Sequence, residues 1–157
     1  LIIDVKRDNK IISCFTFFEG SVILASESGH GFKIKTTNLV AQTKSGKQII
    51  NVKNNNKAKI CKKITGDTIA VVGNNRKLIT YSIEEVPELN KGKGVILQRY
   101  KDGTLSDIMT FRKEDGISWK MNGGRQRTEK DLLTWQGKRG SAGRMVPNGF
   151  PRPPIFN

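Results

Sequence analysis

Residues 20–52 decide the fold, because their pattern returns twice along the chain. They read GSVILASESGHGFKIKTTNLVAQTKSGKQIINV, and residues 66–98 read GDTIAVVGNNRKLITYSIEEVPELNKGKGVILQ. A third, more divergent copy spans residues 115–145, with the sequence DGISWKMNGGRQRTEKDLLTWQGKRGSAGRM. The copies are offset by 46 or 47 residues, since Gly20 precedes Gly66 by 46 and Lys44, Lys91 and Lys138 follow one another at intervals of 47.

Each copy carries the signals of an antiparallel hairpin. A short run rich in β-branched residues precedes a Gly/Asn turn, and a second strand pattern follows it. No segment shows a sustained 3.6-residue apolar period, which a long helix would need. One unit of three to four short strands cannot bury both of its faces, so we expect neighbouring units to stack around an axis as blades do. The sequence therefore predicts an all-β, propeller-like protein of stacked four-stranded blades, and the chain is expected to hold only part of the full set of blades.

The repeat also sets the expected boundaries within one domain, residues 1–157. We expect units at residues 20–65, 66–114 and 115–145, and we expect residues 1–19 to supply strands of a preceding, truncated unit. Because the chain opens with Leu1 in mid-pattern, it is expected to be a piece of a longer protein. Four of the five prolines fall in residues 146–157, and proline cannot donate to a sheet ladder, so an irregular tail is predicted there.

Composition excludes several function classes. The chain has one histidine, His30, and two cysteines, Cys14 and Cys61, without the clustering that a zinc site, a catalytic triad or a disulfide framework requires. It lacks a glycine-rich phosphate loop and a dinucleotide fingerprint. No apolar run approaches the roughly 20 residues that span a bilayer. We therefore expect a cytoplasmic, non-catalytic chain without a cofactor, a metal or a membrane partner.

Charge points to the class of partner. The net charge is +14, and it is concentrated: residues 33–63 hold nine lysines and no acid, and residues 116–157 hold eight basic and two acidic residues. A surface that serves solubility alone mixes both signs. The alternative reading, a solvated face of lysines, explains any single lysine but not a 31-residue window without an acid. The concentration favours a polyanion as the partner.

The basic residues recur at two places in the repeat. One set lies in or near a glycine turn, where a phosphate can approach backbone amides as well as charged side chains. The other follows the hairpin turn, where alternation along Phe32-Lys33-Ile34-Lys35 predicts lysines that point outward. Together with Arg99, these residues form the predicted DNA-binding belt: Lys44, Lys47, Lys91, Lys93, Lys138, Arg139 and Arg144 in the first set, and Lys33, Lys35, Arg76, Lys77, Arg125 and Arg127 in the second.

Double-stranded DNA suits such a belt better than single strands. Stacking on unpaired bases requires exposed aromatic side chains. Tyr81, Tyr100, Trp119 and Trp135 lie mostly within strand patterns and are expected in the core. Binding through phosphates is expected to be independent of sequence and sensitive to salt.

Three long motifs resemble a known family. They are VAQTKSGKQIINV at residues 40–52, GVILQRYKDG at residues 94–103, and the closing stretch from WQGKRG at residue 135 to GFPR at residue 152. They are similar to the C-terminal regions of the gyrase A / topoisomerase IV A family, and within it to the topoisomerase IV A branch. The resemblance spans essentially the whole chain.

The resemblance implies a β-pinwheel, in which propeller-like blades exchange strands and duplex DNA bends around the outer rim. It further implies that the region steers the holoenzyme's relaxation and decatenation in chromosome segregation. The implied partners are double-stranded DNA, the ATPase B subunit of an A2B2 assembly, and the rest of the A subunit. The DNA-cleaving tyrosine, ATP and Mg²⁺ would then belong to parts of the holoenzyme outside this chain.

Two alternatives stay open. A DNA-wrapping domain of gyrase A is one, since Gln136-Gly137-Lys138-Arg139-Gly140-Ser141-Ala142-Gly143 loosely resembles the glutamine-, arginine- and glycine-rich box of gyrase A. The altered spacing of this segment and its place in the last unit favour topoisomerase IV. A protein-interaction propeller with an acidic partner is the other alternative, and it predicts no duplex binding at physiological salt.

Overall fold

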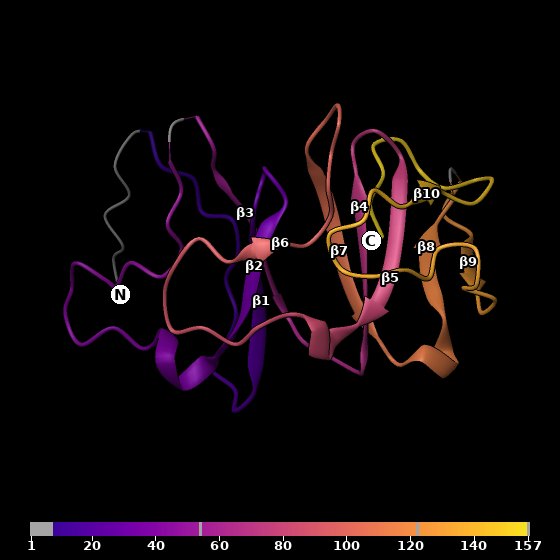
Figure 1. The fold of residues 1–157 in the computed structure, drawn as a ribbon. Coiled ribbons are helices and arrows are strands. Elements are labelled where there is room, and N and C mark those ends of the chain that lie inside the picture. The colour runs from indigo at the N-terminus through magenta and orange to yellow at the C-terminus, as the bar shows by residue number, and fades with distance from the viewer. Residues whose placement is uncertain (1–7, 54, 122, 157) are drawn as a thin grey trace.

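The computed structural model describes residues 8–53, 55–121 and 123–156 (Figure 1). Within them the regular structure is almost entirely antiparallel β-sheet, so the predicted all-β class is confirmed.

The strands form three sheets. The first sheet has the order β3-β1-β2-β6, with bounds Ala58–Lys63, Ser21–Ser26, His30–Lys35 and Val95–Ile96. The second has the order β10-β5-β4-β7, with bounds Arg144–Met145, Lys77–Ser82, Thr68–Gly73 and Leu105–Phe111. The third pairs β8, Ile117–Lys120, with β9, Gln126–Glu129. Three short 3-10 helices follow strands: η1, Thr36–Leu39; η2, Ile83–Glu85; and η3, Lys113–Asp115.

The sequence repeat produces a repeated hairpin. β1 pairs with β2, β4 with β5 and β8 with β9, and the central strands β1 and β4 are buried along nearly their whole length. Burial on both faces explains why these two strands read as continuous apolar runs. The tight turn in the first hairpin uses Gly29, whose φ of 80° is left-handed. Arg76 takes the matching position in the second hairpin with a φ of 63°.

Neighbouring units exchange strands. β6 lies in the second sequence unit but pairs with β2 of the first sheet, and β10 lies in the third unit but pairs with β5 of the second (Figure 1). The two exchanges match bond for bond, since Leu97 N–H donates to the Gly29 carbonyl at 2.8 Å and Val146 N–H donates to the Arg76 carbonyl at 2.9 Å. Each of the two four-stranded sheets is therefore built from two consecutive units, which ties the units into one array.

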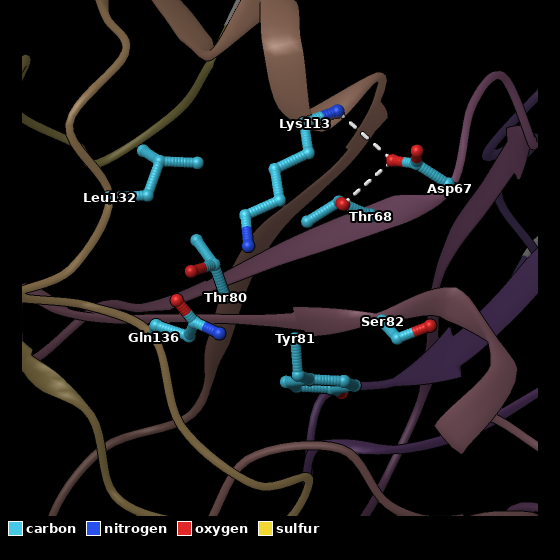
Figure 2. A pocket seen from close by; sticks show the side chains of 8 residues that line it. All are labelled: Asp67, Thr68, Thr80, Tyr81, Ser82, Lys113, Leu132 and Gln136. Atoms are coloured by element: carbon cyan, nitrogen blue, oxygen red, sulfur yellow. Dashed lines mark hydrogen bonds between the residues drawn. The ribbon is translucent and has the colours of Figure 1, made fainter.

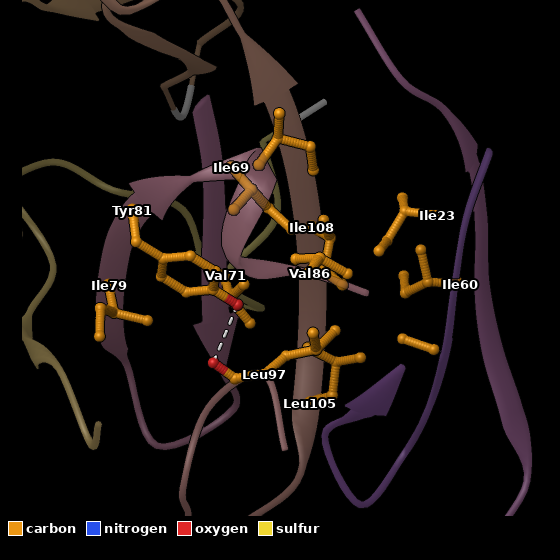
Figure 3. Packing of buried hydrophobic residues seen from close by; sticks show 12 residues of the cluster. Ile23, Ile60, Ile69, Val71, Ile79, Tyr81, Val86, Leu97, Leu105 and Ile108 are labelled. Carbon is orange, nitrogen blue, oxygen red and sulfur yellow. Dashed lines mark hydrogen bonds between the residues drawn. The ribbon is translucent and has the colours of Figure 1, made fainter. Parts of the chain in front are cut away.

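Apolar side chains fill the space between the first two sheets (Figure 3). Ile23 and Ile60 from the first sheet face Val71 and Ile108 from the second, and all four are buried. Tyr81 belongs to the same cluster, and its hydroxyl donates to the Leu97 carbonyl at 3.0 Å. Burial raises the pKa of Tyr81, so this phenol stays neutral and keeps its hydrogen bond.

The C-terminal tail packs against the second and third sheets. Phe150 and Phe156 bury their rings in a cluster with Trp119 of β8. The Asp107 carboxylate accepts from Phe156 N–H at 3.0 Å and also from the Lys62 ammonium at 2.6 Å, which connects the tail to β3 of the first sheet. Between β10 and residue 156 the described part of the tail forms no strand, yet its aromatic side chains make it part of the core.

The strands expected at residues 1–19 are absent from the part that is described. Residues 8–19 form no strand, and residues 1–7 lie outside the described residues. Phe18 packs under the Lys63 ammonium, which lies 4.1 Å from the ring centroid. Ile11 and Phe17 are exposed, so this segment makes few of the contacts that a strand of a complete sheet would make.

Candidate nucleic-acid interface

The three basic glycine turns follow one another along the array. We call residues 44–47 the first basic turn, residues 91–94 the second and residues 138–140 the third. Gly92 N–H donates to the Ile49 carbonyl at 3.0 Å, and Asn51 N–H donates to the Gly92 carbonyl at 2.8 Å, so the second turn lies against the chain that leaves the first. Gly140 N–H donates to the Leu97 carbonyl at 3.1 Å, which places the third turn against the chain that leaves the second. Strand exchange thus brings the three turns into one series.

A glycine is required where the second turn enters the first sheet. Gly94 has a φ of 79°, and a Cβ built on it would lie 2.3 Å from the Gly31 carbonyl oxygen. Gly46 of the first turn has a similar φ of 81°, but a Cβ there would meet nothing within 4 Å. In the second turn glycine allows two backbone segments to approach closely, whereas in the first turn it is needed only for the left-handed φ.

Four lysines in these turns keep their charge available. Lys44, Lys91, Lys93 and Lys138 are exposed, and none of their ammonium groups forms a hydrogen bond or ion pair with any described residue. Lys47 is exposed as well, but its ammonium donates to the Asn38 carbonyl at 2.8 Å within the same loop. The turns therefore present unpaired ammonium groups beside backbone that lacks bulky side chains.

Several other predicted site residues hold the units together instead. The Lys33 ammonium donates to the Ile83 carbonyl at 3.1 Å, and its side chain is only 14% exposed. Alternation along β2 predicted that this ammonium points outward into the belt, and that prediction is wrong. Because the second unit packs over the edge of β2, Lys33 lies at a junction between units rather than on a free face.

Three arginines behave in the same way. Arg76 donates to the Phe150 and Pro151 carbonyls at 3.2 and 2.9 Å, and Arg127 donates to the Asn148 carbonyl at 3.1 Å. Arg139 donates to the Ile96 carbonyl at 2.9 Å. Each guanidinium crosses to a distant segment of the chain, and one of its N–H groups, or two in Arg76, donates there.

The remaining predicted residues lie nearer the surface. Lys35 is 61% exposed and forms a loose ion pair with Glu88 at 3.8 Å. Arg99, Arg125 and Arg144 are exposed, and Lys77 is half-buried. No hydrogen bond or ion pair joins these last four side chains to other described residues.

His30 lies near the second basic turn. Its Nδ1 lies 3.0 Å from the Ser28 hydroxyl. Burial lowers the pKa of His30, and the charge of Lys93 lowers it further. His30 is therefore neutral near pH 7, and protonation at lower pH would add a charge beside a turn that is already positive.

A pocket of 280 Å³ lies between the second sheet and the third unit (Figure 2). Thr80 and Lys33 occupy equivalent positions, because Thr80 bridges to Gln136 as Lys33 bridges to Glu88. The short threonine leaves open the space that the lysine side chain fills at the other junction. Figure 2 shows the Lys113 side chain extending toward Thr80 and Gln136 in that space.

Asp67 borders the same pocket and has a structural role. Its carboxylate accepts from the Thr68 hydroxyl at 2.8 Å and from Lys113 N–H at 2.9 Å, and these hydrogen bonds lower the pKa of Asp67. The second bond satisfies the backbone at the start of η3. Among the described residues, no group of three or more His, Cys, Asp or Glu side chains is arranged to hold a metal ion.

One of the four aromatic residues expected in the core is only half-buried. Trp119 and Tyr81 are buried and Tyr100 is largely buried, as expected, but Trp135 lies half-buried beside the third basic turn. Its position in a turn between β9 and β10, rather than within a strand, is the signal that could have revealed it.

These observations define a class of protein. Antiparallel blades of up to four strands that exchange their edge strands with the next unit are β-pinwheels, a propeller-like architecture. The sequence profile of the family described as "DNA gyrase C-terminal domain, beta-propeller" matches residues 20–60 and 67–112. The chain belongs to this family, which confirms the resemblance found in the sequence.

Known proteins support the same assignment. The A subunit of DNA topoisomerase 4 from Rickettsia bellii is 45% identical over 131 residues, which cover 83% of this chain and 18% of that protein. Its counterpart from Rickettsia prowazekii is 39% identical over 153 residues, 97% of this chain and 20% of that protein. The chain thus spans about a fifth of the length of these curated relatives.

Solved structures share the fold at low sequence identity. The E. coli ParC C-terminal domain has a TM-score of 0.70 and 20% identity, covering 83% of this chain and 57% of that one. A DNA gyrase A C-terminal domain has a TM-score of 0.69 and 14% identity, covering 85% of this chain and 49% of that one. Across the described ranges, no helix is both long and apolar enough to cross a bilayer.

Proposed function

We propose that this chain is a non-catalytic module that binds duplex DNA as part of a topoisomerase IV A-type protein. The observation that carries the proposal is the series of three basic turns, linked by backbone hydrogen bonds, in a chain with a net charge of +14. Unpaired lysines suit the phosphates of a duplex. The N–H groups of Gly46, Gly92 and Gly140 already donate to carbonyls of the chain, so the lysine side chains carry the proposal. Similarity to the A subunits of DNA topoisomerase 4 supports this choice of parent protein.

In this proposal the series of turns is the outer rim around which DNA bends. Bending a short site costs about 1–6 kcal/mol, and phosphate contacts with successive turns would offset that cost. The module would direct ATP-dependent relaxation and decatenation during chromosome segregation in the cytoplasm. Its partners would be the rest of the A subunit, together with the ATPase B subunit of an A2B2 assembly, where ATP and Mg²⁺ are used.

The salt dependence of binding tests the proposal. Fluorescence anisotropy with two duplexes of unrelated sequence, between 50 and 300 mM salt, should give similar affinities. The slope of log K against log salt should be about −3 or steeper, because each phosphate contact contributes about −0.9. A slope near zero, or no duplex binding at low salt, would contradict the proposal and favour an interaction with an acidic protein.

The location of the interface is tested by neutralising the four unpaired lysines. Replacing Lys44, Lys91, Lys93 and Lys138 with Ala should make the salt slope shallower by about three to four, because each lost phosphate contact removes about one. The thermal midpoint should change little, since exposed positions rarely contribute more than about 0.5 kcal/mol.

A charge-matched variant provides the control. It carries the same net charge but replaces four exposed lysines outside the basic turns, Lys59, Lys101, Lys120 and Lys130. We expect this variant to keep most of the salt slope. Equal losses in the two variants would show that overall charge, and not the series of turns, binds DNA.

A further inference from the structure

The third basic turn lies beside an exposed apolar patch, which consists of Trp135 and Met145. The patch belongs to a segment, residues 132–157, that contains four basic residues and no acidic residue. Met145 is 57% exposed, and Trp135 is half-buried. Isolated exposed apolar residues are common, but an indole that is hydrogen-bonded to the backbone of an exposed methionine, on a strongly basic segment, is a candidate contact surface.

Internal comparison shows why the patch is open. Trp135 is equivalent to Pro87, because the Trp135 carbonyl accepts from Thr80 N–H at 2.8 Å just as the Pro87 carbonyl accepts from Lys33 N–H at 2.8 Å. Met145 is equivalent to Ile96, since each ends the short exchanged strand that pairs with the preceding sheet.

The equivalent position in the second unit is covered by the third basic turn. Arg139 donates to the Ile96 carbonyl at 2.9 Å, and a Cβ built on Gly140 would lie 3.9 Å from the Ile96 side chain. At the equivalent place in the third unit the Met145 carbonyl accepts from the Trp135 indole instead, and the Met145 side chain stays 57% exposed. The third unit therefore exposes an apolar side chain, Met145, at the position where the third basic turn lies against Ile96 of the second unit.

The patch is held in a fixed position. The Trp135 indole Nε1–H donates to the Met145 carbonyl at 2.7 Å, which orients the ring along β10. The ring borders a shallow groove whose other walls include Gly137, Gly143 and Arg144. The two glycines add no side chain to the walls, which Ile79, Thr134, Gln136 and Ser141 complete.

Charge identifies the occupant. Arg144 lines the same groove as Trp135, and Lys138 is an exposed residue of the adjoining third basic turn; neither side chain is paired with a described residue. A complementary ligand would place an apolar group against Trp135 and Met145 and an anion against each of the two cations. The deoxyribose of duplex DNA, with a phosphate on either side, has this form, and apolar side chains contact duplexes in this way at the minor groove.

We propose that Trp135 and Met145 pack against deoxyribose at the rim of the duplex, between phosphates bound by Lys138 and Arg144. This inference rests on the proposed function, because it requires that the chain bind duplex DNA. It adds a contact that releases no counterions, so this part of the affinity is insensitive to salt, unlike that of the lysine turns.

Tryptophan fluorescence reports on the site directly. The chain contains two tryptophans, and Trp119 is completely buried, so a response to added DNA should come from Trp135. Titration with a 20-base-pair duplex should shift or quench the emission of the wild-type chain. The Trp135→Phe variant, which keeps an aromatic ring, should lose this response while retaining most of its affinity.

Affinity and salt slope separate the two kinds of contact. Trp135→Ala should weaken binding by about tenfold at every salt concentration and leave the slope unchanged, because apolar burial is lost. Arg144→Gln should make the slope shallower by about one, because a phosphate contact is lost. The thermal midpoints of both variants check that folding is intact, and Trp135→Phe serves if Trp135→Ala is unstable.

The outcomes distinguish the inference from the function on which it rests. If the wild-type chain binds duplex but its emission does not respond and Trp135→Ala binds equally well, the patch is not a DNA contact. The same conclusion follows if emission changes with protein concentration alone, which would indicate that a second copy of the chain covers the patch. If the wild-type chain fails to bind duplex even at low salt, the proposed function fails as well.

Discussion

Lys33 and Thr80 occupy the same position in successive blades, and the difference between them shows how one residue's role depends on its neighbours. The lysine closes a junction by donating to the Ile83 carbonyl, and the threonine leaves the pocket that Lys113 enters. Both positions follow a hairpin turn in sequence, so the repeat alone does not show that one junction is closed and the other contains a pocket. At this position a long cation bonds to the next unit, whereas a short threonine leaves space between the units.

Replacing Lys33 with Met should lower the free energy of unfolding by about 1–2 kcal/mol, because a largely buried, charge-assisted hydrogen bond is lost. Chemical denaturation measures this effect. Lys35→Met is the control, and its effect should stay within about 0.5 kcal/mol because its ion pair is exposed. The DNA affinity of the folded Lys33→Met variant should be nearly unchanged. A large loss of affinity would show that Lys33 contacts DNA after all.

His30 should make stability depend on pH. Its pKa is lower in the folded chain than the ordinary value of 6.5, so the unfolded chain binds a proton more readily. The stabilisation is present above pH 6.5 and is lost as the pH falls through that value toward the folded pKa. The thermal midpoint should therefore drop between pH 7.5 and 5.5, and His30→Gln should reduce the drop; an identical drop in the variant would assign it to other groups.

At the scale of elements, the hairpins follow from local sequence but the exchanged strands do not. β1 and β4 each carry a run of β-branched residues that ends at a turn, which predicts a strand wherever the chain goes. β6 and β10 are two residues long, and they are strands only because a neighbouring sheet offers an edge. Their pairing was expected from family resemblance, not from the residues themselves.

The second basic turn should be sensitive to the loss of its glycine. Gly94→Ala would place a Cβ 2.3 Å from the Gly31 carbonyl oxygen and strain the left-handed φ, so β6 could not pair with β2 in the same position. We expect a loss of stability clearly above the roughly 1 kcal/mol that a left-handed alanine costs alone. Gly46→Ala, with a similar φ but open space, measures that smaller cost, and equal losses would show that close approach is unimportant.

At the scale of the whole molecule, the array ends differently from the way it continues. The third sheet has two described strands where the others have four, and the tail takes the place of further strands by covering Trp119 with Phe150 and Phe156. The sequence predicted an irregular tail from its prolines. It did not predict that this tail joins β7, β8 and β3 through Asp107 and a shared aromatic cluster.

Removing residues 147–157 should therefore unfold the third sheet before the first. Trp119 should become exposed and its emission should shift to the red, while hydrogen exchange in β1 and β2 should stay slow, because their core is separate from the tail. Truncation that leaves Trp119 emission unchanged would show that the two strands of the third sheet are stable without the tail.

The sequence by itself determined the β class, the hairpins and the sites of the basic turns, because strand propensity and glycine conformation act within a few residues. Tertiary structure decided which sheet each short strand joins and which cations remain free, because both depend on groups that lie far away in the sequence, 21 to 75 residues for the cations. Lys33, Arg76, Arg127 and Arg139 look like surface charges in sequence, and only the packing of units shows their ammonium and guanidinium groups bound to carbonyls. A lysine or arginine that donates to a distant backbone carbonyl has the same local sequence pattern as one that remains free to bind a phosphate.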